Sequence, residues 1–372
     1  MDGLKRRRFL QMAAAAAAGP AAAASLSATQ AEPVALGFIG VGSRGTYLLL
    51  TLLTLPGVRV RAICDIDPAH AEEARRLVVA AGQSEPLLFP EWRKLLENRE
   101  IRAVVCAIPC HLHARAYLDI IAAGKDLYGE KPMCITRAEC DAVVAAASKS
   151  DLVIQVGHQR RADPRYIGAM SEVHRGQLGP LIEGRIVWCN PWGPLYGWFG
   201  HAAESGDWIV EQAVHVWDVM NWANRCQPKA AMGLGRNDLF RDRQPDRNVH
   251  DYYSAVVEYE NGVIVNLTHS WVVADKFGEE RLRLSGAIGS LDFDSGLMSF
   301  RKGTGQPERI VPGFRSGINN TLLALESFLD SVRTRKPPVA TVEQARDAVL
   351  TCLLVREAVY RRKVVSLRDL RA

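Results

Sequence analysis

Hydrophobic positions along the chain follow two patterns, which meet near residue 180. In the first part, short apolar runs of strand length alternate with stretches of helical periodicity. The predicted strands are residues 34–39, 58–64, 103–108, 125–128 and 152–156, and the predicted helices are residues 46–55, 68–81, 90–98, 113–123 and 136–148. Strands that alternate with helices are typical of βαβ units, so this part predicts an α/β fold with a doubly wound, parallel Rossmann sheet.

After residue 180, the predicted strands become longer and largely follow one another. They are residues 181–189, 229–235, 251–259, 263–270, 281–285 and 290–293. Asn261-Gly262 is a strong hairpin signal, and the apolar–polar alternation over 263–270 is typical of a sheet with one open face. Late helices are expected at 322–334 and 342–361. This part therefore predicts an α+β domain in which helices cover one face of an open, mixed or antiparallel sheet.

The first residues carry a different pattern. Arg6-Arg7-Arg8-Phe9-Leu10 resembles a twin-arginine core and precedes an alanine-rich stretch. Residues 1–31 are therefore predicted to be a twin-arginine signal peptide, cleaved near Ala31, and the mature protein is expected to be periplasmic or otherwise exported. Since no later stretch approaches ~18 uninterrupted apolar residues, we expect no membrane span in the mature chain.

The formal net charge of +5 suggests a nucleic-acid partner only until the charges are located. The first 31 residues hold four basic side chains and one acidic side chain, so the rest of the chain nets only +2. It therefore lacks the charge expected of a nucleic-acid-binding protein. The eight cysteines form no C-x-x-C motif and have no metal-ligand spacing with the histidines. We expect reduced, buried cysteines and no metal site.

A glycine-rich turn follows the first predicted strand. Gly40-Val41-Gly42-Ser43-Arg44-Gly45 has the G-x-G-x-x-G spacing, in which Gly40 allows the turn, Gly42 lets a pyrophosphate approach and Gly45 allows close packing. Asp65 lies 20 residues after Gly45, where a carboxylate would bind the adenosine ribose and repel a 2′-phosphate. The pattern favours NAD over NADP. The alternative is a glycine turn that binds nothing, with Asp65 capping a helix.

Glu130-Lys131-Pro132 follows the predicted strand at 125–128. The carboxyl end of a parallel strand is where such folds bind ligands, and a lysine beside a nicotinamide can act as an acid or a base. Taken alone, this tripeptide is more often a surface turn.

Five motifs in this order resemble one family. They are the glycine turn, Asp65, Ile108–His113, Glu130-Lys131-Pro132 and Val156–Arg161. Over about residues 34–365, the chain resembles the Gfo/Idh/MocA oxidoreductases. The resemblance implies a catalytic Lys131 and a dinucleotide site. Besides the three glycines and Asp65, the candidate cofactor contacts are Ser43, Arg44, Ile108, Pro109, His111, His113, Glu130 and Lys131. His111 and His113 have an alternative role, as caps of the next helix.

The resemblance also implies an Asp-x-x-x-His pair in the second domain. The matching residues are Glu211 and His215, with glutamate in place of the aspartate. Their i, i+4 spacing predicts one helical face, and His215 is the candidate acid/base that shares a proton with Lys131. A buried, hydrogen-bonded histidine is the alternative for His215, and Glu211 could instead bind a hydroxyl or a neighbouring cation.

Six of the eight tryptophans fall within residues 188–222. Aromatic faces pack well on sugar C–H groups, so Trp192 and Trp198, in a loop rich in glycine and proline, are candidate substrate contacts. Trp217 and Trp222 are expected in the core instead. Three further substrate candidates follow the last Rossmann strand: His158, Arg160 and Tyr166.

The predicted organisation is a signal peptide at 1–31, an NAD-binding Rossmann domain at 32–158 and a substrate and oligomerisation domain at 159–372, whose late helices could return to the first domain. The expected function is hydride transfer between NAD and a hydroxyl carbon of a sugar, cyclitol or glycoside. One alternative is an NAD-dependent glycoside hydrolase that oxidises a ring carbon transiently, and another is a non-catalytic sugar-binding homologue. By resemblance, the protein is expected to be a homo-oligomer, a dimer or a tetramer.

Overall fold

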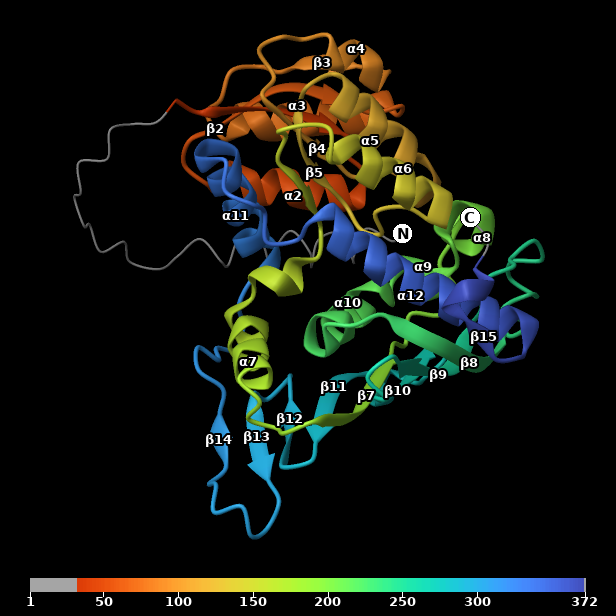
Figure 1. The fold of residues 1–372 in the computed structure, drawn as a ribbon. Helices are drawn as coiled ribbons and strands as arrows, with labels where there is room; N and C mark the ends of the chain where they lie inside the picture. The colour runs from red at the N-terminus through yellow and green to blue at the C-terminus, as the bar shows by residue number, and fades with distance from the viewer. Residues whose placement is uncertain (1–31, 371–372) are drawn as a thin grey trace. The chain divides into compact units, whose positions relative to one another are not determined.

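The computed structural model describes residues 32–370 (Figure 1). The predicted twin-arginine signal and its cleavage site lie outside the described residues. Among residues 32–370, every helix is too short or too polar to span a bilayer.

The first sheet forms where short apolar runs alternate with helices. Counted over the described residues, six strands pair in the order β3-β2-β1-β4-β5-β6, and every pairing is parallel. The strands are β1 (Val34–Ile39), β2 (Val58–Cys64), β3 (Leu87–Phe89), β4 (Ala103–Cys106), β5 (Asp126–Gly129) and β6 (Ile154–Val156). This is the strand order of dinucleotide-binding folds, so the predicted Rossmann sheet is confirmed.

Helices connect these strands, and side-chain caps begin two of them. The helices are α2 (Ser43–Leu53), α3 (Pro68–Ala80), α4 (Trp92–Leu96), α5 (His113–Ala122) and α6 (Arg137–Ala147). At the start of α3 the Asp67 carboxylate accepts the Ala69 N–H at 2.8 Å, and at the start of α6 Thr136 forms a capping box with Glu139. Helix α2 begins three residues before the predicted start, because its first turn lies within the glycine motif and carries no apolar periodicity.

The second sheet is mixed, as predicted. Within the described part of the chain it has nine strands in the order β14-β13-β12-β11-β7-β10-β9-β8-β15, and only β7 and β10 pair in parallel. The strands are β7 (Leu181–Cys189), β8 (Pro228–Arg236), β9 (Tyr252–Tyr259), β10 (Ile264–Ser270), β11 (Glu279–Gly286), β12 (Gly289–Asp292), β13 (Leu297–Phe300), β14 (Arg309–Ile310) and β15 (Val365–Ser366).

Helices cover one face of this sheet (Figure 1). The larger ones are α7 (Pro164–His174), α10 (Val214–Asn224) and α12 (Val342–Arg361), and α8 (Ala202–Ser205) and α9 (Trp208–Glu211) are single turns. Helix α11 (Asn320–Thr334) packs instead on the first sheet, where Leu325 and Phe328 share a core with Leu36 and Phe38.

Within residues 32–370, the other face of the second sheet is bare. Side chains alternate between the two faces of a strand, and Met232, Leu234 and Ile264 point to the uncovered side with 53%, 55% and 46% of their surface exposed. The predicted open face is therefore present, and it carries apolar side chains.

The eight cysteines all fall within residues 32–370 and form no disulfide there. Seven are buried, and Cys226 is partly exposed. The expectation of free, buried thiols is confirmed for these seven.

Candidate active site

The glycine motif forms a tight turn between β1 and α2. Gly40 has φ +83°, and a Cβ there would lie 2.4 Å from the carbonyl oxygen of Ala107. A Cβ on Gly45 would lie 2.0 Å from the carbonyl oxygen of Gly40. In contrast, a Cβ on Gly42 would meet no atom within 4 Å. The loop is therefore close-packed on its inner side and open at the start of α2, where main-chain N–H groups can receive a pyrophosphate. Ser43 opens this helix and is exposed.

Asp65 stands at the end of β2 beside this loop. Its Oδ2 accepts the Val41 N–H at 2.8 Å and its Oδ1 accepts the Asp67 N–H at 2.9 Å. A carboxylate has about four lone-pair sites, so capacity remains for two ribose hydroxyls. Ile66 follows with 89% of its surface exposed, which places an apolar surface next to the ribose position. Sequence reasoning missed Ile66, whose signal is an apolar residue directly after the ribose carboxylate. These features fit the adenosine half of NAD.

Glu130 links the segment after β5, which carries Lys131, to the glycine motif through hydrogen bonds. It is 4% exposed and its Oε1 accepts Arg44 Nε at 2.7 Å. Its Oε2 accepts the Lys131 N–H at 3.1 Å, and its carbonyl accepts the Tyr117 hydroxyl at 2.6 Å. Arg44 is thus bound to a buried carboxylate, and Glu130 acts on Lys131 through the main chain.

The segment after β4 brings the two candidate histidines into different surroundings. Ile108 and Pro109 are partly exposed beside the glycine turn. His113 is 1% exposed, and its two ring nitrogens lie 2.6 Å and 2.8 Å from the carbonyls of Pro132 and Ile108. Its ring therefore joins two loops. His111 keeps a buried Nδ1 that has no hydrogen-bond partner among the described residues.

Lys131, in the segment after β5, contacts Glu211 at the end of α9. Lys131 Nζ donates to the Glu211 carbonyl oxygen at 2.7 Å and to Glu211 Oε1 at 2.5 Å. Both side chains retain some exposure, 15% and 13%. An ammonium group has three N–H donors, so one remains for a ligand. Glu211 therefore binds a cationic neighbour, which is the second role that sequence reasoning left open for it.

Glu211 and His215 do not share one helix, and the prediction of a single helical face was wrong. Glu211 ends α9 and His215 lies in the first turn of α10, after a break at Gln212 and Ala213. The His215 N–H bonds the Gln212 carbonyl at 3.2 Å instead of the Glu211 carbonyl. The break leaves the Glu211 carbonyl free for Lys131, so tertiary contacts outweigh the local i, i+4 pattern.

A buried hydrogen-bonded cluster fixes this break. Gln212 Oε1 accepts Trp271 Nε1 at 3.1 Å and lies 2.8 Å from His269 Nε2. His269 Nδ1 lies 2.8 Å from the Tyr253 hydroxyl, and burial lowers the pKa of His269 to about 3. A neutral His269 can donate to Gln212 and accept from Tyr253. Sequence reasoning did not connect these residues, because they come from three separate elements.

His215 is poised as a base. Burial holds its pKa well below the ordinary value, and the charges of Lys131 and Arg160 lower that pKa further. No group in the described part of the chain forms a hydrogen bond with its ring, whose aromatic neighbours are His158 at 6.3 Å and Trp188 at 6.2 Å. A neutral imidazole with an unbonded nitrogen can accept a proton from a ligand.

His158 is the second histidine of this group. It is 2% exposed, and neither ring nitrogen has a hydrogen-bond partner within residues 32–370. Burial lowers its pKa, and the nearest carboxylate, Asp218, is 3.8 Å away and held by Arg161. Leaving buried polar groups unpaired costs about 1–3 kcal/mol each, so these nitrogens indicate a polar ligand or water at this place.

Arg160 lies between two aromatic rings. Its guanidinium carbon is 5.2 Å from the Trp188 ring centre and 5.6 Å from that of Tyr166, and it forms an ion pair with Glu280. Arg160 Nη1 is buried without a partner in the described chain. Tyr166 is 3% exposed and stacks on Phe293 at 5.6 Å. Trp188, which sequence reasoning did not single out, contacts His215, Arg160 and His269 from the end of β7.

The loop after β7 leaves its aromatic residues further out. Trp192 is 56% exposed and lies edge-on to Trp271 at 5.7 Å, and Trp198 stacks on Phe199 at 3.8 Å. Within the described residues, no hydrogen bond or ring contact joins either side chain to Lys131 or His215, so their substrate role stays a prediction. Trp217 is fully buried and Trp222 packs against the same core, as expected.

Two family models match the chain. Residues 34–158 match the model described as "Oxidoreductase family, NAD-binding Rossmann fold", and residues 168–292 match the "GFO/IDH/MocA C-terminal domain". The chain belongs to the Gfo/Idh/MocA oxidoreductase family. NAD is accordingly its cofactor, in agreement with the open glycine turn and the Asp65 carboxylate, and the chain is an oxidoreductase.

Known proteins agree with this membership. The chain is 26% identical over 280 residues to inositol 2-dehydrogenase of Acidothermus cellulolyticus, which covers 75% of this chain and 78% of that protein. A levoglucosan dehydrogenase structure, in complex with NADH and levoglucosan, has the same fold with a TM-score of 0.78 at 19% identity, over 90% of this chain and all of the other. A shorter match, 27% over 169 residues, joins 44% of this chain to 37% of an alpha-N-acetylgalactosaminidase of Shewanella oneidensis.

Proposed function

We propose that this Gfo/Idh/MocA oxidoreductase transfers a hydride between NAD and a hydroxyl-bearing carbon of a sugar or cyclitol. The observation that carries the proposal is the Lys131 ammonium group, which Glu211 holds through two hydrogen bonds and which keeps one N–H for a ligand. The ring of His215 has no hydrogen-bond partner among the described residues, and the charge of Lys131 helps to lower its pKa. The inositol 2-dehydrogenase relative and the levoglucosan dehydrogenase fold support a polyol or sugar as the substrate class.

Bound NAD supplies the hydride acceptor. The free N–H of Lys131 donates to the substrate hydroxyl oxygen and stabilises the negative charge that develops there. An unbonded ring nitrogen of His215 takes the hydroxyl proton as the carbinol hydrogen leaves as hydride, and the carbon–oxygen bond becomes a carbonyl. The unpaired nitrogens of His158 and Arg160 Nη1 would bind neighbouring hydroxyls.

A panel of sugars and cyclitols, monitored by reduced-nicotinamide absorbance, tests the proposal. We expect the Lys131→Ala protein to retain NAD, measured by mass spectrometry of the undenatured protein, and to lose about 10²–10⁴-fold in turnover. Unchanged turnover in that variant would show that Lys131 is not a catalytic residue. A wild-type protein that binds NAD but oxidises no member of the panel would contradict the substrate class.

The partial match to a galactosaminidase supports a second candidate function. A glycoside hydrolase of this type oxidises a ring carbon transiently, eliminates the aglycone, adds water and returns the hydride, so no net redox occurs. The discriminating test is cleavage of aryl glycosides without added oxidant. Cleavage without net NADH would replace the dehydrogenase proposal. A non-catalytic homologue is less well supported, because the glycine turn and the Lys131–Glu211 pair are intact.

Export by the twin-arginine pathway is also a proposal, supported by residues 6–10. Free NAD is expected to be scarce outside the cytoplasm, so an exported enzyme would carry its cofactor tightly bound. Cell fractionation of the wild type and of an Arg6→Lys, Arg7→Lys variant tests export, and an unchanged distribution in that variant would contradict it. We further propose a homo-oligomer that covers the bare face of the second sheet, to be tested by light scattering with Met232→Glu as the disrupting variant.

A further inference from the structure

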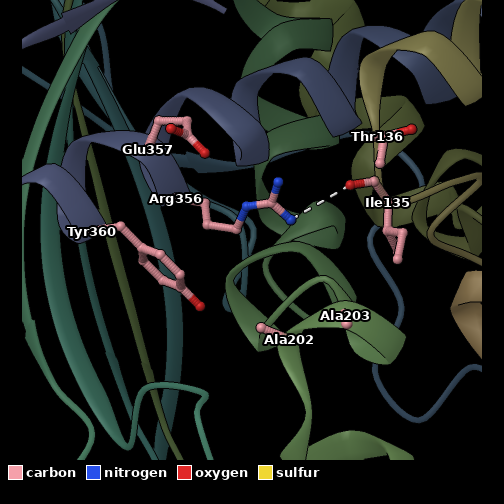
Figure 2. A pocket seen from close by; sticks show the side chains of 7 residues that line it. All are labelled: Ile135, Thr136, Ala202, Ala203, Arg356, Glu357 and Tyr360. Atoms are coloured by element: carbon pink, nitrogen blue, oxygen red, sulfur yellow. Dashed lines mark hydrogen bonds between the residues drawn. The ribbon is translucent and has the colours of Figure 1, made fainter.

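Helix α12 binds both chain segments that carry the Lys131–Glu211 pair. Two of its side chains, Arg356 and Tyr360, line a pocket of about 280 Å³ (Figure 2), and no lining residue belongs to the site described above. The contacts of these two side chains connect this pocket to the catalytic pair.

Arg356 joins the two segments directly. Its Nη1 lies 3.4 Å from the Ile135 carbonyl oxygen and 3.1 Å from the Gly206 carbonyl oxygen, and Figure 2 shows the side chain extending from α12 to Ile135. Ile135 lies four residues after Lys131, and Gly206 lies five residues before Glu211. One guanidinium therefore holds together the two loops whose side chains form the pair.

The two loops are in close contact at this point. Gly206 has φ +81°, and a Cβ there would lie 3.0 Å from Ile135 Cγ2. A side chain at this position would be strained at the positive φ and would force Ile135 to move by a few tenths of an ångström. The hydrogen bonds of Arg356 therefore stabilise a place where the Ile135 and Gly206 segments are already packed together.

Asp207 holds the turn that carries Glu211. It is fully buried and has φ +66°, which is unusual for a residue with a side chain. Its Oδ1 accepts the Ile209 N–H at 3.2 Å, and its carbonyl accepts the Glu211 N–H at 2.9 Å. Its Oδ2 accepts the Tyr360 hydroxyl at 2.8 Å and the two N–H groups of His250 at 3.0 Å and 2.9 Å. Tyr360 and His250 therefore fix the conformation in which Glu211 faces Lys131.

We infer that Arg356, Tyr360 and Asp207 are positioning residues, which hold the Glu211 main chain and thereby orient Lys131. We call the three the α12 clamp. Within residues 32–370, the side chains of these three residues form no hydrogen bond or ion pair with a candidate cofactor or substrate residue, and the Asp207 carbonyl bonds the Glu211 N–H. A loosened clamp would leave binding intact and disorient Lys131 in the reacting complex, because small misplacements of a catalytic group cost rate rather than affinity. The kinetic part of this inference rests on the proposed function.

Two conservative variants test the clamp. Tyr360→Phe removes one hydroxyl, and Arg356→Lys keeps the charge but loses the forked reach of the guanidinium. We expect kcat to fall about tenfold in each, while KM and NAD retention change less than about twofold. The matched control is Glu357→Gln, because Glu357 lines the same pocket and, among the described residues, forms its ion pair with Arg361 at 2.7 Å. This variant should retain wild-type kcat.

A double-mutant cycle tests the route. If the clamp acts by orienting Lys131, then Tyr360→Phe adds little to the loss already caused by Lys131→Ala, which removes both bonds to Glu211. Additive losses would show that Tyr360 acts elsewhere and would overturn the inference.

A second measurement needs no substrate. Acetylation of Lys131 by acetic anhydride, relative to the exposed Lys302, can be measured by peptide mass spectrometry of the holoprotein. We expect faster labelling of Lys131 in Tyr360→Phe and Arg356→Lys, but not in Glu357→Gln, because a lysine with weakened acceptors is more reactive. Unchanged labelling and unchanged kcat in folded clamp variants would overturn the clamp. If one variant does not fold by circular dichroism, the other decides. Since labelling is independent of turnover, a failed sugar panel would contradict only the proposed function.

Discussion

Single residues in this site are fixed by main-chain groups more than by one another. Asp65 accepts two backbone N–H groups, His113 lies between two backbone carbonyls, and Lys131 donates to a third. His215 and His158 differ, since their rings have no hydrogen-bond partner within the described residues. The residues left unbonded are thus the ones that we expect to contact the substrate.

The charge of Asp65 should decide between the two nicotinamide cofactors. Asp65→Asn keeps the size of the side chain but removes the charge that repels a 2′-phosphate and weakens its bonds to ribose hydroxyls. We expect NAD affinity to fall about 10–100-fold and the preference for NAD over NADP to shrink, as measured by calorimetry with both cofactors. The control is Asp67→Asn, because Asp67 caps α3 through Ala69. An equal loss for both cofactors would argue against a role at the ribose.

The pH dependence of oxidation should report the unusual environment of His215. Its pKa lies well below the ordinary value of about 6.5, so the neutral, proton-accepting form persists as the pH falls through 6.5. We expect kcat/KM for polyol oxidation to show no acid limb near pH 6.5 and to decline only at lower pH. An acid limb at about pH 6.5 would contradict this environment. His215→Gln should lower kcat/KM by about 10²–10⁴-fold throughout.

At the scale of elements, the turn from β1 to α2 separates packing from binding. A Cβ at position 45 would overlap the Gly40 carbonyl, whereas one at position 42 would meet no protein atom within 4 Å. We expect Gly45→Ala to lower the unfolding free energy by about 1–3 kcal/mol. Gly42→Ala should leave stability near wild type but weaken NAD binding, because its methyl group enters the pyrophosphate position.

Denaturant unfolding and NAD titration of both variants check this pair. The expected result is a stability loss in Gly45→Ala only and a binding loss in Gly42→Ala at full stability. Equal NAD affinity in wild type and Gly42→Ala would show that the pyrophosphate does not lie over this turn.

Sequence pattern predicts the elements with a long, regular apolar period and misses the others for physical reasons. Residues 34–39, 181–189 and 342–361 match their strands and helix in full. Strands β3, β14 and β15 have two or three residues each, too few to show alternation. Helix α7 begins at Pro164 with Asp163 as its cap, a start signal that the prediction did not use.

In the candidate site, too, the features set by local main-chain geometry could be predicted and those set by long-range contacts could not. The spacing of the glycine turn and Asp65 locates the adenosine half of the cofactor site, because both depend on local main-chain geometry. The helix break between Glu211 and His215 could not be predicted from local sequence. It depends on Gln212, which bonds His269 on strand β10 and Trp271 directly after that strand. Contacts between elements that are distant in sequence leave no periodic signal.

At the scale of the whole molecule, a late helix packs against the first sheet. Helix α11 comes from the last third of the sequence, yet it completes the core of the first sheet through Leu325 and Phe328. Gln155 Nε2 donates to the Ala324 carbonyl at 2.8 Å, which adds a buried polar tie. The first sheet therefore depends on residues that follow all but the last strand of the second sheet.

This dependence predicts coupled unfolding. Phe328→Ala removes a fully buried ring and should lower the unfolding free energy by about 3–5 kcal/mol. Because the ring belongs to the core of the first sheet, NAD should dissociate in the same transition that unfolds the chain. Cofactor release and circular dichroism during denaturation check this. A release of NAD well before the loss of secondary structure would contradict the coupling.

The carbonyl of Glu211 has one more consequence, for mutational tolerance. Because the helix break frees a main-chain acceptor for Lys131, every residue at position 211 supplies that acceptor, whatever its side chain. One of the two hydrogen bonds that Lys131 makes to Glu211 is thus independent of which amino acid stands at this position. We therefore expect Glu211→Asp to change turnover without abolishing it, because the main-chain bond to Lys131 is retained.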